Sequence, residues 1–93
     1  MEAQESKCPL CDGQVTFIGD PSRKTAEYTC EGSCGTYTFN DEFLREMQNS
    51  QHWERTRKDL ARALALGVVR ERDFNCEVDI RQAMISLSRT EKS

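Results

Sequence analysis

The chain has 93 residues and a formal net charge of −3, with 31% charged and 37% hydrophobic residues, the cysteines included. A chain of this length forms one domain, or one domain with a small appendage. No stretch approaches the roughly 20 apolar residues that a membrane-spanning helix needs, so we expect no membrane contact. So small a core rarely holds a fold of this size unaided, and an additional cross-link such as a metal ion is expected.

The N-terminal segment predicts the cellular compartment. Residues 1–7 contain no apolar run of the kind found in a signal peptide. We therefore expect a cytoplasmic protein in a reducing compartment, where closely paired cysteines bind metals or do redox chemistry rather than form disulfides. Residues 1–6 and 90–93 are expected to be frayed tails.

Four of the five cysteines form two close pairs. Two residues separate Cys8 from Cys11, three separate Cys30 from Cys34, and eighteen lie between the pairs. Zn²⁺ takes four thiolates at about 2.3 Å in a tetrahedron, and such a pair can bind one ion if the chain turns sharply between its members. Three glycines that favour tight turns lie within or just after the pairs: Gly13, Gly32 and Gly35. We predict one structural Zn²⁺ held by Cys8, Cys11, Cys30 and Cys34, with iron as the alternative metal.

Residues 7–39 hold both prolines and most of the β-branched and aromatic residues, which is typical of β-structure. We predict strands over residues 14–18, 26–30 and 36–39, with a turn over residues 19–22. In the third strand threonine alternates with aromatic residues, which suits a half-buried sheet face.

From Asn40 onward the sequence is helical in character. Asn40 is a suitable N-cap for a short helix, because acidic residues fill the turn that follows it. A second helix is predicted over residues 51–66 with Gly67 as its C′ residue, and a third from residue 75 or 76 to about 89. Residues 69–74 fit neither pattern clearly. The expected fold is a small, metal-stabilised α+β protein, with a three-stranded ribbon over residues 1–39 and a unit of two to three helices over residues 40–93.

The second predicted helix has two distinct sides. Trp53, Leu60 and Leu64 form its buried seam. Three basic residues gather on the opposite side: Arg55, Lys58 and Arg62. The simpler interpretation of this stripe is a solvated face with Glu54–Lys58 and Arg55–Asp59 pairs. The third helix places four apolar residues on one side: Ile80, Ala83, Met84 and Leu87.

The segments Cys8-Pro9-Leu10-Cys11-Asp12-Gly13, Tyr28-Thr29-Cys30 and Cys34-Gly35-Thr36-Tyr37 resemble a zinc ribbon. The resemblance is to the ribbons of many small bacterial and phage proteins, and it covers roughly the first 40 residues. It implies four cysteine ligands to zinc and a helix after the last strand. Zinc ribbons serve as nucleic-acid binders, protein docking modules and structural caps, so the fold alone does not give the function.

Charge favours a protein partner over nucleic acid. Residues 1–39 carry three basic and six acidic side chains, and an acidic surface binds phosphate backbones poorly. We expect an interaction protein whose ribbon and helices form a docking platform, with a homodimer through the long helix left open. The alternative is a transcription-associated nucleic-acid-binding protein that uses the basic helix face. An iron-containing electron carrier similar to rubredoxin is a third class.

We expect no enzymatic activity. His52 is the only histidine, and no serine or threonine near it has the glycine-rich setting of a catalytic nucleophile. Neither a glycine-rich phosphate loop nor a metal site with an open position is evident. Cys76 is expected to be a small buried apolar residue. Four residues are candidates for an interaction surface: Trp53, Arg55, Lys58 and Arg62.

Overall fold

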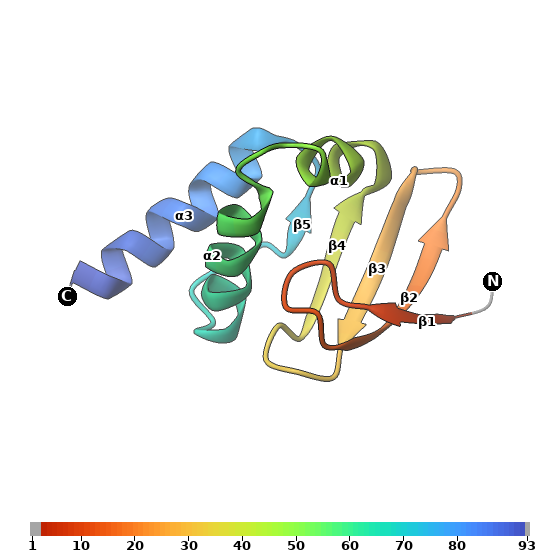
Figure 1. The fold of residues 1–93 in the computed structure, drawn as a ribbon, viewed down its shortest axis with the longest axis horizontal. Coiled ribbons are helices and arrows are strands. Elements are labelled where there is room, and N and C mark those ends of the chain that lie inside the picture. Colours follow the sequence, from red (N-terminus) through yellow and green to blue (C-terminus); the bar gives the residue numbers. More distant parts are fainter. Residues whose placement is uncertain (1–2, 93) are drawn as a thin grey trace.

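The computed structural model describes residues 3–92 and shows an α+β fold with a five-stranded sheet and three helices over that range (Figure 1). The strands, in their order across the sheet, are β1 (Gln4–Lys7), β2 (Gln14–Asp20), β3 (Thr25–Cys30), β4 (Thr36–Asn40) and β5 (Asp73–Phe74). Neighbours from β1 to β4 are antiparallel, and β5 runs parallel to β4. The three predicted strands are confirmed as β2, β3 and β4, but the prediction of a three-stranded ribbon omitted β1 and β5.

Strand β1 corrects the expectation that residues 1–6 are frayed. Gln4 lies opposite Phe17 and Lys7 opposite Gln14, because the chain reverses between the two strands. The four side chains of β1 are all exposed. A polar edge strand of this kind lacks the apolar alternation from which strands are predicted, and it discourages pairing with other chains. Residues 1 and 2 lie outside the described range.

Strand β5 brings the C-terminal half of the chain back to the sheet. It falls in the segment 69–74 to which the sequence assigned no structure. Phe74 is fully buried and lies opposite Phe39, with their ring centroids 5.1 Å apart. The Thr38 N–H donates to the Arg72 carbonyl at 2.7 Å. A strand of two residues shows no periodicity, so only long-range pairing with β4 reveals it.

The helices are α1 (Asp41–Gln48), α2 (Trp53–Ala65) and α3 (Glu77–Lys92). Asn40 caps α1 as predicted, since its Oδ1 accepts from the Phe43 N–H at 3.0 Å. Gly67 has a φ of 71° and ends α2 as predicted. There the Gly67 N–H donates to the Leu64 carbonyl and the Val68 N–H to the Ala63 carbonyl, which is a Schellman motif.

Helix α3 also corrects a prediction. It starts near the predicted residue but continues through residues 90–92, which were expected to fray. The Thr90 hydroxyl donates to the Ser86 carbonyl at 3.0 Å. Arg62 of α2 pairs with Glu91 at 2.9 Å, and this contact attaches the last turn of α3 to α2. Residue 93 lies outside the described range. No helix within residues 3–92 is long and apolar enough to cross a membrane.

The core lies between the helices and one face of the sheet. Aromatic rings cross this face in contact with one another, from Tyr28 to Tyr37 to Phe39, and Phe39 then meets Phe43 of α1 and Phe74 of β5. The helices contribute buried aliphatic side chains: Leu44, Leu60, Ala63, Leu64, Ile80, Ala83 and Leu87. Trp53 is half-buried against the same cluster. The predicted seam of α2 therefore faces the core, and both halves of the chain contribute to one cluster.

Candidate metal centre

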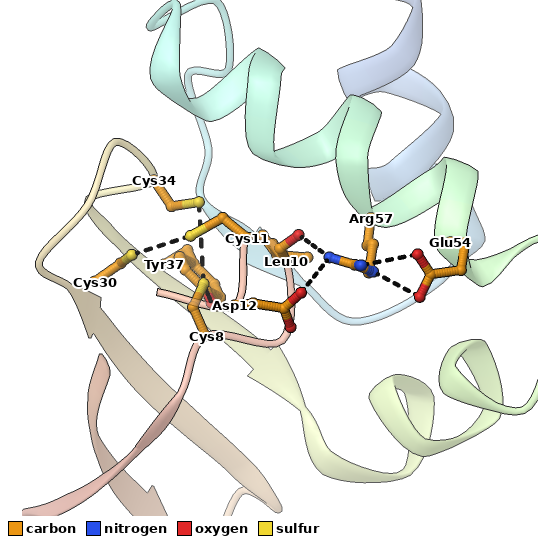
Figure 2. A network of polar contacts seen from close by, with 9 residues as sticks. All are labelled: Cys8, Leu10, Cys11, Asp12, Cys30, Cys34, Tyr37, Glu54 and Arg57. Atoms are coloured by element: carbon orange, nitrogen blue, oxygen red, sulfur yellow. Dashed lines mark hydrogen bonds and ion pairs between the residues drawn. The ribbon is translucent and has the colours of Figure 1, made fainter. Parts of the chain in front are cut away.

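The two cysteine pairs lie at one end of the sheet. The first knuckle, residues 8–13, connects β1 to β2, and the second knuckle, residues 30–35, connects β3 to β4. Both are at the same end because Val15 of β2 lies opposite Cys30 of β3. Figure 2 shows the four cysteine side chains pointing toward one another. Their Sγ atoms all lie within 4.8 Å of one another.

The sulfur positions fit one tetrahedral metal ion. Four sulfurs at about 2.3 Å from a central ion are separated from one another by about 3.8 Å. The Sγ atoms of Cys8 and Cys34 are 4.0 Å apart, and those of Cys11 and Cys30 are 3.5 Å apart. The two sulfur atoms of a disulfide are only about 2.05 Å apart, and all four cysteines are free thiols. The four residues could therefore hold a metal ion, in an arrangement consistent with a zinc ribbon.

The two knuckles are closed by the same type of hydrogen bond despite their different cysteine spacing. The Cys8 N–H donates to the Gly13 carbonyl at 2.6 Å, and the Cys30 N–H donates to the Gly35 carbonyl at 2.9 Å. Each knuckle therefore spans six residues. In the first, the left-handed residue is Asp12, with a φ of 62°, and in the second it is Gly35, with a φ of 72°. The extra residue between the second pair of cysteines does not change how the knuckle closes.

Gly13 and Gly32 do not have the conformational role predicted for them, since neither has a positive φ. A Cβ atom on Gly13 would lie 3.4 Å from the Cys11 Sγ, and one on Gly32 would lie 3.5 Å from the Cys30 Sγ. Both positions pack directly against the sulfur cluster. A methyl group added at either position would therefore make an ordinary van der Waals contact with a cysteine sulfur.

Tyr37 belongs to the surroundings of the candidate metal site, a role that its sequence position did not indicate. Its ring is buried, and its hydroxyl lies 2.9 Å from the Cys8 Sγ. Burial, and then the hydrogen bond to Cys8, raises the pKa of Tyr37, so the phenol stays protonated and donates to a Cys8 thiolate. Hydrogen bonds from Cys34 and Tyr37 lower the pKa of Cys8. Such contacts orient metal ligands and stabilise their charge.

Arg57 holds the first knuckle. Its side chain is only 13% exposed, and its Nη1 donates to the Leu10 carbonyl at 2.9 Å and pairs with Asp12 at 3.3 Å (Figure 2). Glu54 binds the other side of the guanidinium with two hydrogen bonds, of 3.1 and 2.8 Å. The sequence did carry a signal, because Arg57 lies on the seam of α2, four residues after Trp53. A cation in an apolar stripe needs a partner when it is buried.

Arg72 holds the second knuckle. Its Nη1 donates to the Cys34 carbonyl at 3.0 Å, and its Nη2 donates to the Leu64 carbonyl of α2 at 3.3 Å. Arg72 directly precedes β5, in the segment that had no predicted structure. No local pattern marks it, because its acceptors lie 38 and 8 residues away.

The predicted basic stripe lies away from the metal centre. Arg55, Lys58 and Arg62 are exposed on α2, and Arg62 is engaged by Glu91. Glu54 pairs with Arg57 rather than with Lys58 as predicted, because Arg57 is held next to it by the first knuckle. His52 is exposed.

The prediction that Cys76 is buried is wrong. Cys76 is exposed and directly precedes α3. The Asp79 carboxylate accepts from the N–H groups of Asn75 and Cys76 at 2.8 and 3.3 Å, which caps the start of α3. The Cys76 side chain is exposed because its residue occupies the helix cap rather than the buried face.

Comparison of the chain with protein-family models, curated proteins and solved structures gave no match. The function must therefore be inferred from the geometry of this chain.

Proposed function

We propose that the protein is a non-enzymatic interaction protein, in which one structural Zn²⁺ stabilises the platform that docks a protein partner. Four protein thiolates complete a tetrahedron, and a site without an open position is typical of structural zinc rather than catalytic zinc. Its location in the cytoplasm and a homodimer through the long helix stay predictions.

The observation that carries the docking proposal is the setting of Trp53. A groove of about 380 Å³ lies where α1, α2 and α3 meet, and Trp53 lines it. Its apolar wall consists of Phe43, Met47, Trp53 and Ile80. Half-buried tryptophans are frequent anchors at protein interfaces, because they offer a large apolar area together with a polar N–H. The groove suits an apolar side chain from a protein segment.

The charged residues of α2 give less support to nucleic-acid binding. Arg62 is paired with Glu91, which leaves Arg55 and Lys58 as the available cations of the stripe. Two or three phosphate contacts contribute little affinity at physiological salt.

Site-specific photocrosslinking tests the proposal. A photoreactive residue at His52, which is exposed and lines the groove, should crosslink one discrete protein in the source cells. The same residue at Lys58, on the other side of α2, is the matched control. Trp53→Ala should remove the crosslink from position 52, whereas Arg55→Ala should leave it. Crosslinks to nucleic acid from position 58, with none from position 52, would support the alternative function instead.

The identity of the metal is tested separately. Native mass spectrometry of the purified protein should show one zinc per chain and a colourless sample. A red, redox-active iron site would favour the electron-carrier class.

A further inference from the structure

We propose that Arg57 and Arg72 form a clamp through which the metal ion fixes α2 against the sheet, so that release of the metal loosens α2. The inference rests on the proposed zinc but not on any partner. It is carried by the hydrogen bonds that these two side chains make to the knuckles.

The acceptors of the clamp belong to the parts of the chain that the metal would order. Leu10, whose carbonyl binds Arg57, lies between the two cysteines of the first knuckle. The carbonyl that binds Arg72 is that of Cys34 itself. A metal ion that fixes the four sulfurs also fixes the direction of these two carbonyls. Without it, each acceptor can turn away from its guanidinium, whereas the partners on α2 remain in place: Glu54 for Arg57 and the Leu64 carbonyl for Arg72.

The clamp holds α2 near both of its ends. Arg57 is on the second turn of α2 and contacts the first knuckle, with Glu54 orienting its guanidinium. Arg72 joins the Leu64 carbonyl, at the C-terminal end of α2, to the second knuckle. The two knuckles belong to different hairpins and meet at the sulfur cluster. The position of α2 is therefore tied to that cluster at two points.

The same helix forms one wall of the Trp53 groove. Trp53 and Thr56 line that groove, and Thr56 directly precedes Arg57. A shift of α2 on metal release would therefore change the groove. Trp53 is the only tryptophan in the chain, so tryptophan fluorescence reports on the surroundings of this one residue of α2.

The first test measures Zn²⁺ affinity by competition with a chromophoric chelator. Arg57→Gln and Arg72→Gln should each bind Zn²⁺ about tenfold more weakly than the unmodified protein, the range typical for residues that support metal ligands. Arg55→Gln is the matched control on the exposed side of α2 and should stay within twofold. Affinities within twofold for both clamp variants would overturn the proposal.

The second test starts with the unmodified protein, so its main result does not depend on how the variants fold. Removal of Zn²⁺ by a chelator should shift Trp53 emission to longer wavelength and increase its quenching by iodide, and added Zn²⁺ should reverse both changes. In zinc-loaded Arg57→Gln, the emission should already be shifted in the same direction. Trp53 emission that is unchanged by zinc removal would overturn the clamp. A protein that binds no zinc at all would overturn the proposed function instead.

Discussion

The hydroxyl of Tyr37 lies 2.9 Å from the Cys8 Sγ, at the boundary between the aromatic core and the metal centre. The Tyr37 ring stacks on Tyr28 with centroids 5.3 Å apart and meets Phe39 edge-on. One side chain therefore connects the metal environment to the core that the helices share. The metal and the core should consequently stabilise each other.

Replacing Tyr37 by phenylalanine isolates the hydrogen bond from the packing. The ring contacts remain, but the Cys8 thiolate loses a hydrogen-bond donor. The free energy of unfolding of the zinc-loaded protein should therefore fall by about 1–2 kcal/mol. Urea denaturation at fixed free zinc measures this change. Tyr28→Phe, which removes a hydroxyl from the neighbouring stacked ring, is the control. An equal loss in both variants would mean that the hydrogen bond to Cys8 contributes nothing specific.

Loss of one cysteine from the cluster should release the metal. Cys11→Ser replaces one thiolate of the four, and we expect native mass spectrometry to show no bound zinc at micromolar concentration. Because a structural metal contributes its binding energy to folding, the thermal unfolding midpoint should also fall. Cys76→Ser is the matched control, since Cys76 is exposed and outside the cluster, and it should keep one zinc. Retention of zinc by Cys11→Ser would refute the assignment of the site.

Alanine substitutions at Gly35 and Gly67 separate the cost of backbone strain from the cost of a close steric contact. Both glycines have a positive φ, of 72° and 71°, which is unfavourable for a residue with a Cβ atom. Alanine at either position should therefore lower the free energy of unfolding by about 1–2 kcal/mol. A Cβ at Gly35 would also lie 3.1 Å from the Arg72 Nη1, whereas at Gly67 it would meet nothing within 4 Å. Gly35→Ala should therefore destabilise the protein more than Gly67→Ala in urea denaturation. Equal losses would show that Arg72 moves aside without cost.

The pairing of Glu54 with Arg57 should appear in the acid dependence of stability. The hydrogen bond from Arg57 holds the pKa of Glu54 below its ordinary value of 4.5. The carboxylate therefore stabilises the fold above about pH 4.5, and this contribution is lost as the pH falls through the lower pKa of the folded state. The midpoint of urea unfolding should fall between pH 7 and pH 3.5 in the unmodified protein. In Glu54→Gln this fall should be smaller. Equal differences for the two proteins would show that this pairing contributes nothing to the acid dependence.

The isolated protein should have no appreciable affinity for DNA or RNA. Three phosphate contacts from Arg55, Lys58 and Arg62 would give a slope of at most about −2.7 for log affinity against log salt, and weak binding at physiological salt. Fluorescence anisotropy with a labelled duplex measures this directly. The triple change to alanine should also leave crosslinking from position 52 intact. Tight, sequence-selective binding that the triple change abolishes would favour the nucleic-acid alternative.

Features decided by a few neighbouring residues were predictable from the sequence. The cysteine spacing identified both pairs, because each pair needs only one sharp turn, and the preference of Zn²⁺ for four thiolates indicated that the two pairs share one site. Asn40 and Gly67 determined where α1 begins and where α2 ends, because capping bonds join groups within a few residues. The strands with aromatic or β-branched alternation were identified for the same local reason.

Contacts across long stretches of sequence were decided only by the tertiary structure. Strand β5 is too short for a periodic signal and exists because Phe74 packs beside Phe39. In the sequence, Arg57 and Arg55 are two arginines of one charged helix, and the seam position of Arg57 predicts burial but names no partner. What distinguishes Arg57 is the Leu10 carbonyl, 47 residues away, which becomes its acceptor only after the first knuckle and α2 have packed together.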